Sequence, residues 1–292
     1  TEEERRERVN ALKAQWASEE KRGGFGYLRR RYKGSQRKEV ARGEAKRVVP
    51  TVGIGGSGVR RKSHKLTVLS LCDGIGTVAL ALQWVRDWIA KEFGLELEIE
   101  VYAVEWDPVA RAVAVARTQG RQRHKQPHDV WEWATATNEE TVRTWMEAVG
   151  GIDWLVMGFS CQGLSVANRR GTGLQCEKSS VFFPGLRTLQ IAQSVNEEVS
   201  FTYECTDFRK KFPEDYETVC EGLGVEAEVL EAGKIEAAWR TRLFWANYEL
   251  LPLENRLRTP GEVLGEGRQP AGRWIEKLPT IMAAGPRSWN MS

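Results

Sequence analysis

Short apolar runs alternate along the chain with longer stretches in which apolar residues recur every three or four positions. Strands are expected for the apolar runs at 66–71, 97–104, 152–156, 201–204 and 227–230. Amphipathic helices are expected at 77–91, 108–118, 138–149 and 181–193. Alternation of short buried strands with helices is typical of an α/β protein built on one open sheet.

The first part of the chain departs from this alternation. Residues 1–22 predict a charged helix with few apolar anchors, and residues 23–65 are rich in Gly, Arg and Lys. Such a composition buries too little apolar surface to fold by itself. We therefore divide the chain into a basic, largely disordered N-terminal arm at 1–65 and a folded domain at 66–292.

Composition bounds the class of protein. The 292 residues are 41% hydrophobic and 28% charged, which is typical of a soluble globular protein. No apolar run approaches the roughly 20 residues that a membrane span needs, and the charged N-terminus does not resemble a secretory signal. Five cysteines without CxxC spacing favour a reducing compartment over a disulfide framework or a zinc site. The first residue is Thr and not Met, which suggests a processed chain or a fragment.

The small net charge of +3 hides a marked asymmetry. Residues 1–65 hold 19 Lys and Arg against 8 Asp and Glu, and the remainder holds 24 against 32. A basic arm joined to an acidic domain indicates a polyanionic partner such as nucleic acid. A solvated tail without a partner is the alternative.

The candidate catalytic and ligand-binding residues lie at the ends of the expected strands. Cys161 follows the strand at 152–156 in a turn that has Gly158 and Gly163 on either side. Open α/β sheets bind their ligands at this carboxyl edge. The alternative is that Cys161 is a small buried hydrophobic residue, as free cysteines often are.

A second candidate site is the glycine turn 72–76 between the first strand and the helix that follows. A strand, a tight turn and a helix N-terminus can receive a polar ligand group, although an ordinary turn has the same pattern. Glu105, at the end of the second strand, is placed to accept hydrogen bonds from ribose hydroxyls. Asp107 before Pro108 is expected to cap the next helix. Asp129 is expected at another strand end, on the adenine side of the same ligand.

The remaining candidates are polar residues of loops and later strands. Residues 166–178 predict a long mobile loop that closes over a substrate, with arginines that could meet phosphates. Glu204 ends the strand at 201–204. Arg240 and Arg242 alternate with apolar residues, which in a strand would place both on one face; surface arginines of an edge strand are the alternative. His124 and His128 are expected in an exposed loop, and no metal site is expected.

In order and content, these landmarks resemble the cytosine-5 DNA methyltransferases, nearest to the de novo class. Residues 69–77 (LSLCDGIGT) resemble the family's first cofactor motif, and residues 158–165 (GFSCQGLS) resemble its catalytic Pro-Cys loop. Tyr203-Glu204 resembles the Glu-Asn-Val motif, and residues 237–245 (AAWRTRLFW) the Arg-x-Arg motif. The similarity covers about residues 66–292, where Leu278-Pro279-Thr280-Ile281 resembles the opening of the target-recognition region.

The resemblance implies a Rossmann-like S-adenosylmethionine-dependent methyltransferase sheet with helices on both faces. It implies that this fold binds S-adenosylmethionine and a cytosine-containing DNA duplex, and it leaves room for a second methyltransferase subunit as a partner. Catalytic roles are implied for Cys161, Glu204, Arg240 and Arg242. Cofactor contacts are implied for Cys72, Asp73, Gly74, Ile75, Gly76, Thr77, Glu105, Trp106, Asp129 and Val130. The location implied is nuclear, or cytoplasmic for a prokaryotic or viral source.

Three departures from the family pattern keep other functions open. Ser160 stands where the family has proline, and Cys205-Thr206 replaces Asn-Val. The chain also ends where the target-recognition region should begin, so the final motifs are missing. One alternative is a catalytically degenerate subunit that binds DNA or regulates a partner. A second is the same chemistry on RNA.

Overall fold

The computed structural model describes residues 64–250 and residue 262. The predicted arm, apart from its last two residues, and the segment at 278–281 lie outside the described residues. Among the helices described, none is long and apolar enough to cross a membrane.

Within this part of the chain, seven strands form one sheet. They are β1 (His64–Leu71), β2 (Leu97–Val104), β3 (Gln122–His124), β4 (Trp154–Gly158), β5 (Ser200–Thr206), β6 (Glu228–Glu231) and β7 (Thr241–Ala246). Their order is β3-β2-β1-β4-β5-β7-β6. The first five strands are parallel, and β7 runs antiparallel to both β5 and β6.

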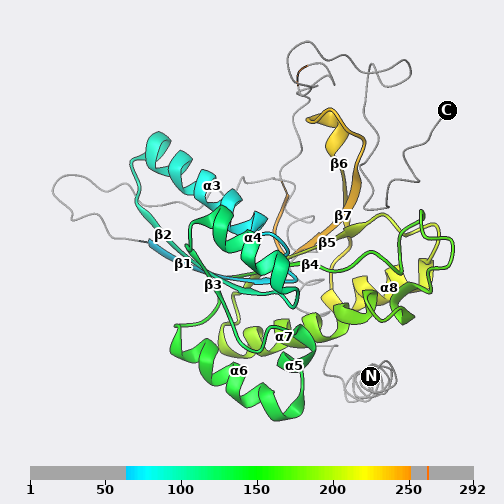
Figure 1. Cartoon of the computed structure of the whole chain (residues 1–292), viewed down its shortest axis with the longest axis horizontal. Helices are drawn as coiled ribbons and strands as arrows, with labels where there is room; N and C mark the ends of the chain where they lie inside the picture. Colours follow the sequence, from blue (N-terminus) through cyan, green and yellow to red (C-terminus); the bar gives the residue numbers. More distant parts are fainter. Residues whose placement is uncertain (1–63, 251–261, 263–292) are drawn as a thin grey trace, which may run out of the picture.

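Helices cover both faces of the sheet (Figure 1). One face carries α3 (Thr77–Phe93) and α4 (Pro108–Thr118). The other carries α5 (Val130–Trp133), α6 (Ala136–Ala148), α7 (Phe182–Val195) and α8 (Pro213–Leu223). The structure therefore confirms the predicted fold class, a Rossmann-like α/β sheet with helices on both faces.

The apolar sequence of β1 explains why both faces are covered. Successive side chains of a strand point to opposite faces. Val68 packs with Ala79 of α3, whereas Leu69 and Leu71 belong to the larger core on the α5–α7 side. All three β1 side chains are fully buried. A strand covered on both sides is therefore mostly apolar, and the two polar residues within this run, Thr67 and Ser70, are buried as well.

The strand order reverses at β1, which lies between β2 and β4. In open α/β sheets, ligands bind outside the carboxyl ends of the strands at this point of reversal. Leu71 pairs with Met157, so the turn after β1 and the turn after β4 leave the sheet side by side. Gly158 pairs with Glu204, which brings the end of β5 to the same edge.

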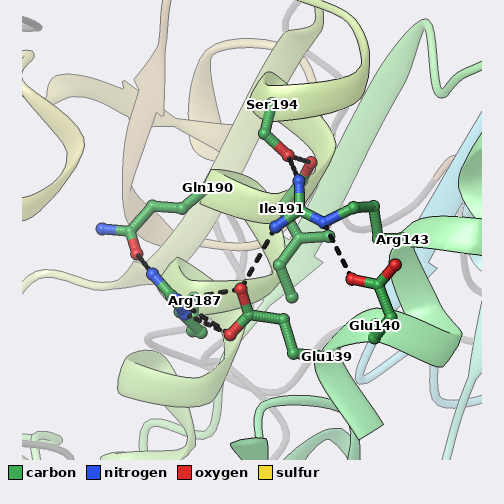
Figure 2. Close-up of polar contacts among 7 residues, drawn as sticks. All are labelled: Glu139, Glu140, Arg143, Arg187, Gln190, Ile191 and Ser194. Atoms are coloured by element: carbon green, nitrogen blue, oxygen red, sulfur yellow. Dashed lines mark hydrogen bonds and ion pairs between the residues drawn. The ribbon is translucent and has the colours of Figure 1, made fainter.

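An ion-pair network joins α6 to α7 on the face opposite α3 and α4 (Figure 2). Arg187 donates to both carboxylate oxygens of Glu139, with its Nη2 2.8 Å from Oε2. Arg143 contacts Glu139 as well and also donates to Ser194. The side chains of Glu139, Arg143 and Arg187 are about three-quarters buried. The network fixes α7, the helix that follows the Cys161 turn, against the rest of the domain.

Several elements differ from their predicted bounds. The strand expected at 152–156 is β4, two residues further along at 154–158. Helix α8 occupies residues that we expected to be irregular. Its signals were present in the sequence: Pro213 begins it, Glu214 and Asp215 lie in its first turn, and Gly224 ends it.

Candidate active site

The turn after β1 is built on residues with positive φ. Cys72 has φ 53°, Gly74 63° and Gly76 77°. A Cβ on Gly76 would lie 3.0 Å from Thr118 Cγ2 and 3.2 Å from Ala114 Cβ, so the absence of a side chain lets α3 approach α4. A Cβ on Gly74 would meet nothing within 4 Å. A ligand could therefore approach the backbone of Gly74 from the side on which a Cβ would project.

Glu105 connects the ends of β1 and β2. Its Oε2 accepts a hydrogen bond from Gly74 N at 2.8 Å, and its Oε1 accepts one from Asp107 N at 2.9 Å. The side chain is only 6% exposed. Each carboxylate oxygen has a second lone pair that a ligand hydroxyl could use. The adjacent Trp106 is 65% exposed and offers an apolar surface beside this carboxylate.

Asp73 has a structural role in the turn. Its buried carboxylate accepts hydrogen bonds from Ser70 Oγ and Gln122 Nε2, both at 2.6 Å. These contacts hold the turn on β1 and β3 and leave less of the carboxylate for a ligand. The other turn residues for which we expected cofactor contacts, Ile75 and Thr77, have exposed side chains.

Asp129 does not lie at a strand end, contrary to our expectation. Strand β3 ends at His124, and Asp129 is the N-cap of α5, where its side chain accepts a hydrogen bond from Trp131 N at 3.0 Å. Within residues 64–250, β3 pairs with β2 alone, and five residues separate its end from α5. Val130, the next residue, packs in the core at 4% exposure.

Three carboxylates nevertheless surround Cys72. Burial raises the pKa of the Cys72 thiol well above its usual range, and the charges of Glu105, Asp129 and Asp73 raise it further. The thiol is therefore protonated at neutral pH. The three carboxylates make the region at the carboxyl ends of β1 and β2 acidic, which favours a ligand that carries positive charge.

The two histidines of this region are half-buried, whereas we expected exposed loop residues. His124 belongs to β3, and burial lowers its pKa below the usual value. Nδ1 of both His124 and His128 and Oε1 of Gln122 are buried without a hydrogen-bond partner in the described structure. The described residues contain no group of three His, Cys, Asp or Glu side chains placed to hold a metal ion.

Cys161 lies in the turn that follows β4. Its carbonyl oxygen accepts hydrogen bonds from Leu164 N at 3.0 Å and Ser165 N at 2.8 Å. Ser160, in the position where the resembled family has proline, accepts a hydrogen bond at 3.4 Å from Gln162 N through its Oγ. This hydroxyl contact gives the turn a local constraint in place of the proline ring. The Cys161 side chain is partly buried and packs at the edge of the core.

The loop at 166–178, which we predicted to be mobile, is fastened to the domain at several points. Gly163 N and Ser179 Oγ, which flank the loop on either side, are joined by a hydrogen bond of 2.8 Å, and within the loop Leu174 N donates to Asp215 Oδ2 at 2.9 Å. Lys211 Nζ donates to the Ser165 and Asn168 carbonyls. These anchors lie up to 46 residues away in sequence, so local pattern did not indicate them. Arg169 and Arg170 have exposed side chains.

Glu204 and Arg242 form an ion pair near the end of β5, which continues to Thr206 and does not end at Glu204 as we expected. Arg242 Nε lies 2.9 Å from Glu204 Oε1, and the two side chains are 18% and 30% exposed. Burial raises the pKa of the Glu204 carboxyl above its usual value, and the charges of Arg242 and Arg240 partly offset this effect. The Glu204 carboxyl is therefore easier to protonate than an exposed glutamic acid.

Arg240 does not share a strand face with Arg242, contrary to our expectation. Strand β7 begins at Thr241, and Arg240 precedes it with an exposed side chain. Its backbone N–H donates to Glu231 Oε1 at 2.7 Å, which ends the extended pairing there. Its charge still reaches Glu204, whose pKa it lowers.

Cys205 follows Glu204 in β5 and contacts the residues that lead into the Cys161 turn. Its Sγ donates a weak hydrogen bond to Phe159 O at 3.8 Å. Burial raises the pKa of the Cys205 thiol, and the charges of Cys161 and Glu204 raise it further. The structure thus brings Cys161, Glu204 and Arg242 together at one edge of the sheet, beside the turn at 72–76.

Comparison with known proteins adds little to this geometry. No protein-family model matches the chain, and no curated protein matches it. Among solved structures, the chain aligns with one described as the DhpI–SAH complex, at 12% identity and a TM-score of 0.28. The alignment covers 68% of this chain and 63% of the other, so this chain spans less than two thirds of that protein's length. A likeness at this level carries no argument for a shared function, and the fold class is established by the sheet itself.

Proposed function

We propose that this domain is an S-adenosylmethionine-dependent methyltransferase that acts on C5 of cytosine in DNA through a covalent adduct with Cys161. The observation that carries the proposal is the Glu204–Arg242 ion pair at 2.9 Å beside the Cys161 turn, on the same sheet edge as the glycine turn. A thiol, a carboxyl of raised pKa and an arginine are the groups that this reaction requires.

The residues around the β1 turn fit the cofactor. Glu105 can accept hydrogen bonds from ribose hydroxyls, and the exposed Trp106 ring can stack on an adenine. The acidic surroundings of Cys72 suit the positive charge of a sulfonium. Bound at this turn, S-adenosylmethionine would supply an electrophilic methyl group.

Each catalytic residue has a definable task in the proposed reaction. Cytosine C5 becomes nucleophilic when the Cys161 thiolate adds to C6, which makes the ring enamine-like. Glu204, in its protonated form, donates to ring N3 and stabilises the charge that develops during this addition. Arg242 orients the base and balances the carboxylate when Glu204 is ionised. After methyl transfer, a base such as water takes the C5 proton; the electrons of the C5–H bond form the C5–C6 double bond again, and the C6–S bond breaks to release Cys161 as thiolate.

A cytosine in a duplex hides both reactive carbons, so the base must leave the stack. Arg169 and Arg170, exposed on the loop that follows Cys161, are available for backbone phosphates. The +11 charge at residues 1–65 adds to the attraction of a polyanion. These features support a nucleic-acid substrate, and the choice of DNA rests on the sequence resemblance.

Covalent trapping tests the proposal. The protein is incubated with S-adenosylmethionine and a duplex that carries 5-fluorocytosine, because fluorine at C5 cannot leave as a proton does. We expect an SDS-stable adduct that requires the cofactor and disappears in Cys161→Ser. Cys176→Ser is the matched control and should still form the adduct.

The same experiment separates the alternatives. A folded protein that binds the duplex without forming an adduct would indicate a degenerate DNA-binding subunit. An adduct with a 5-fluorocytosine RNA, and none with DNA, would assign the chemistry to RNA.

A further inference from the structure

Residues 159–178, which connect β4 to the helical turn at Ser179–Val181, form the Cys161 loop. Contacts within this loop join its two halves. Gly173 N donates to Gly163 O at 3.0 Å, and a Cβ on Gly171 would lie only 2.3 Å from the same oxygen. Asn168 Nδ2 donates to Gln162 O at 2.6 Å. These contacts tie residues 162–163, close to β4, to residues 168–173, so a shift of one segment requires a shift of the other.

One lysine from a distant segment holds this unit. Lys211 Nζ donates to Ser165 O at 3.0 Å and also to Asn168 O. Both carbonyls lie just beyond the turn whose hydrogen bonds close on Cys161 O. An ammonium group has three donors, so one side chain can bind two carbonyls from a single point.

Lys211 is itself fixed to the core. Its backbone N–H and that of Phe212 both donate to Phe208 O, at 3.0 and 2.9 Å, and Phe208 is fully buried. The ammonium lies 4.9 Å from the centre of the Phe212 ring. Four residues further along the chain, Asp215 holds the loop at Leu174 N. Lys211, two residues before α8, and Asp215, in the first turn of α8, thus hold the loop at two places.

We propose that Lys211 is a positioning residue that locks the Cys161 loop in its working geometry, an inference that rests on the proposed role of Cys161 as nucleophile. Lys211 acts through the Ser165 and Asn168 carbonyls and does not contact the reacting base. Without it, the loop opens more often and Cys161 is held less accurately against C6.

The test compares Lys211→Met with Lys210→Met, which removes the same charge from the adjacent exposed residue. The first readout is tryptic cleavage after Arg169 and Arg170, mapped by mass spectrometry, with thermal unfolding as the check on folding. Loss of two charge-assisted hydrogen bonds should accelerate cleavage by about fivefold in Lys211→Met alone. Lys211→Arg should restore much of the protection, because guanidinium also donates to more than one carbonyl.

The second readout is the rate of adduct formation on the 5-fluorocytosine duplex at saturating DNA. We expect a lower rate in Lys211→Met, an unchanged affinity for the duplex and recovery in Lys211→Arg. Equal cleavage and equal adduct rates in the two Met variants would overturn the proposal. If the wild-type protein forms no adduct, the proposed function fails. Faster cleavage in Lys211→Met, and not in Lys210→Met, would still show that Lys211 holds the loop in place.

Discussion

Arg242 Nε lies 2.9 Å from Glu204 Oε1, and the two residues come from antiparallel strands 38 positions apart. In the β5–β7 register Arg242 faces Thr206, so it reaches Glu204 diagonally across the strand pair. Burial raises the pKa of Glu204 and Arg242 lowers it. The burial of Glu204 and the nearness of Arg242 therefore act in opposite directions on how readily Glu204 takes up a proton.

Replacement of Arg242 by Gln should raise the pKa of Glu204 further, because the largest opposing charge is removed. The pH dependence of adduct formation should then shift to higher pH relative to wild type. Adduct yield after a fixed reaction time, measured between pH 5 and pH 9, reports this shift. Lys234→Gln, a change of the same charge on an exposed residue, is the control and should leave the profile in place. An unchanged profile in Arg242→Gln would show that Glu204 does not govern the step.

The same pair makes stability depend on pH in a defined direction. Because the folded pKa of Glu204 lies above its unfolded value of 4.5, the folded state binds a proton more tightly. This contribution to stability is present below pH 4.5 and is lost as the pH rises through the folded pKa. Urea unfolding of wild type and Glu204→Gln across this window should show the contribution in wild type alone.

His124 should have the opposite effect on stability. Burial lowers its folded pKa below the unfolded value of 6.5, so the unfolded state binds the proton first as the pH falls. Stability should therefore decrease as the pH drops from 6.5 through the folded pKa. We expect His124→Asn to flatten this part of the curve of urea midpoint against pH. An identical slope in wild type and variant would contradict the prediction.

Glu139 should contribute to stability through the network of Figure 2. Its carboxylate receives Arg187 in a bidentate contact and also Arg143. Glu139→Ala should lower the free energy of unfolding by about 1–2 kcal/mol, because two partly buried guanidinium groups lose their partner. Glu140→Ala is the matched control: its side chain is 82% exposed, and its loss should cost less than about 0.5 kcal/mol.

Gly163 should not tolerate a side chain. A Cβ there would lie 2.2 Å from Cys176 Cβ and 2.5 Å from Gly173 O, so the loop would have to move. We expect Gly163→Ala to cost about 1–3 kcal/mol in a urea unfolding experiment. In Gly158→Ala the new Cβ would meet only Glu204 Oε2, at an ordinary 3.5 Å, so stability should change little. Equal free energies of unfolding in the two variants would show that the loop can move to accept a side chain at Gly163 with little energetic cost.

The sequence was most informative where structure depends on neighbouring residues. Asp107 and Pro108 predicted a helix start, and Asp107 Oδ1 accepts a hydrogen bond from Val109 N at 2.8 Å at the beginning of α4. The bounds of β2 and α4 were predicted residue for residue. Helix α8 had equally local signals in Pro213 and Gly224, although we did not predict it.

Sequence reasoning failed where distant contacts decide the outcome. Asp129 caps α5 and does not end a strand, because β3 ends five residues earlier, at His124. Arg240 lies outside β7 because its backbone binds Glu231 in the preceding segment. Lys211 and Asp215 hold the Cys161 loop across more than 40 residues, and neither has a sequence signal for that role.

The sequence by itself determined the fold class and the landmarks of the site, because strand and helix periodicity and caps arise from interactions within a few residues. Only the tertiary structure decided which landmarks meet. The register of β1 with β4 and of β4 with β5 places Cys161 and Glu204 at one edge, and β7 brings Arg242 to them. The Glu204 pKa and the anchoring of the loop depend on burial and on groups that strand pairing brings together, so local pattern could not predict them.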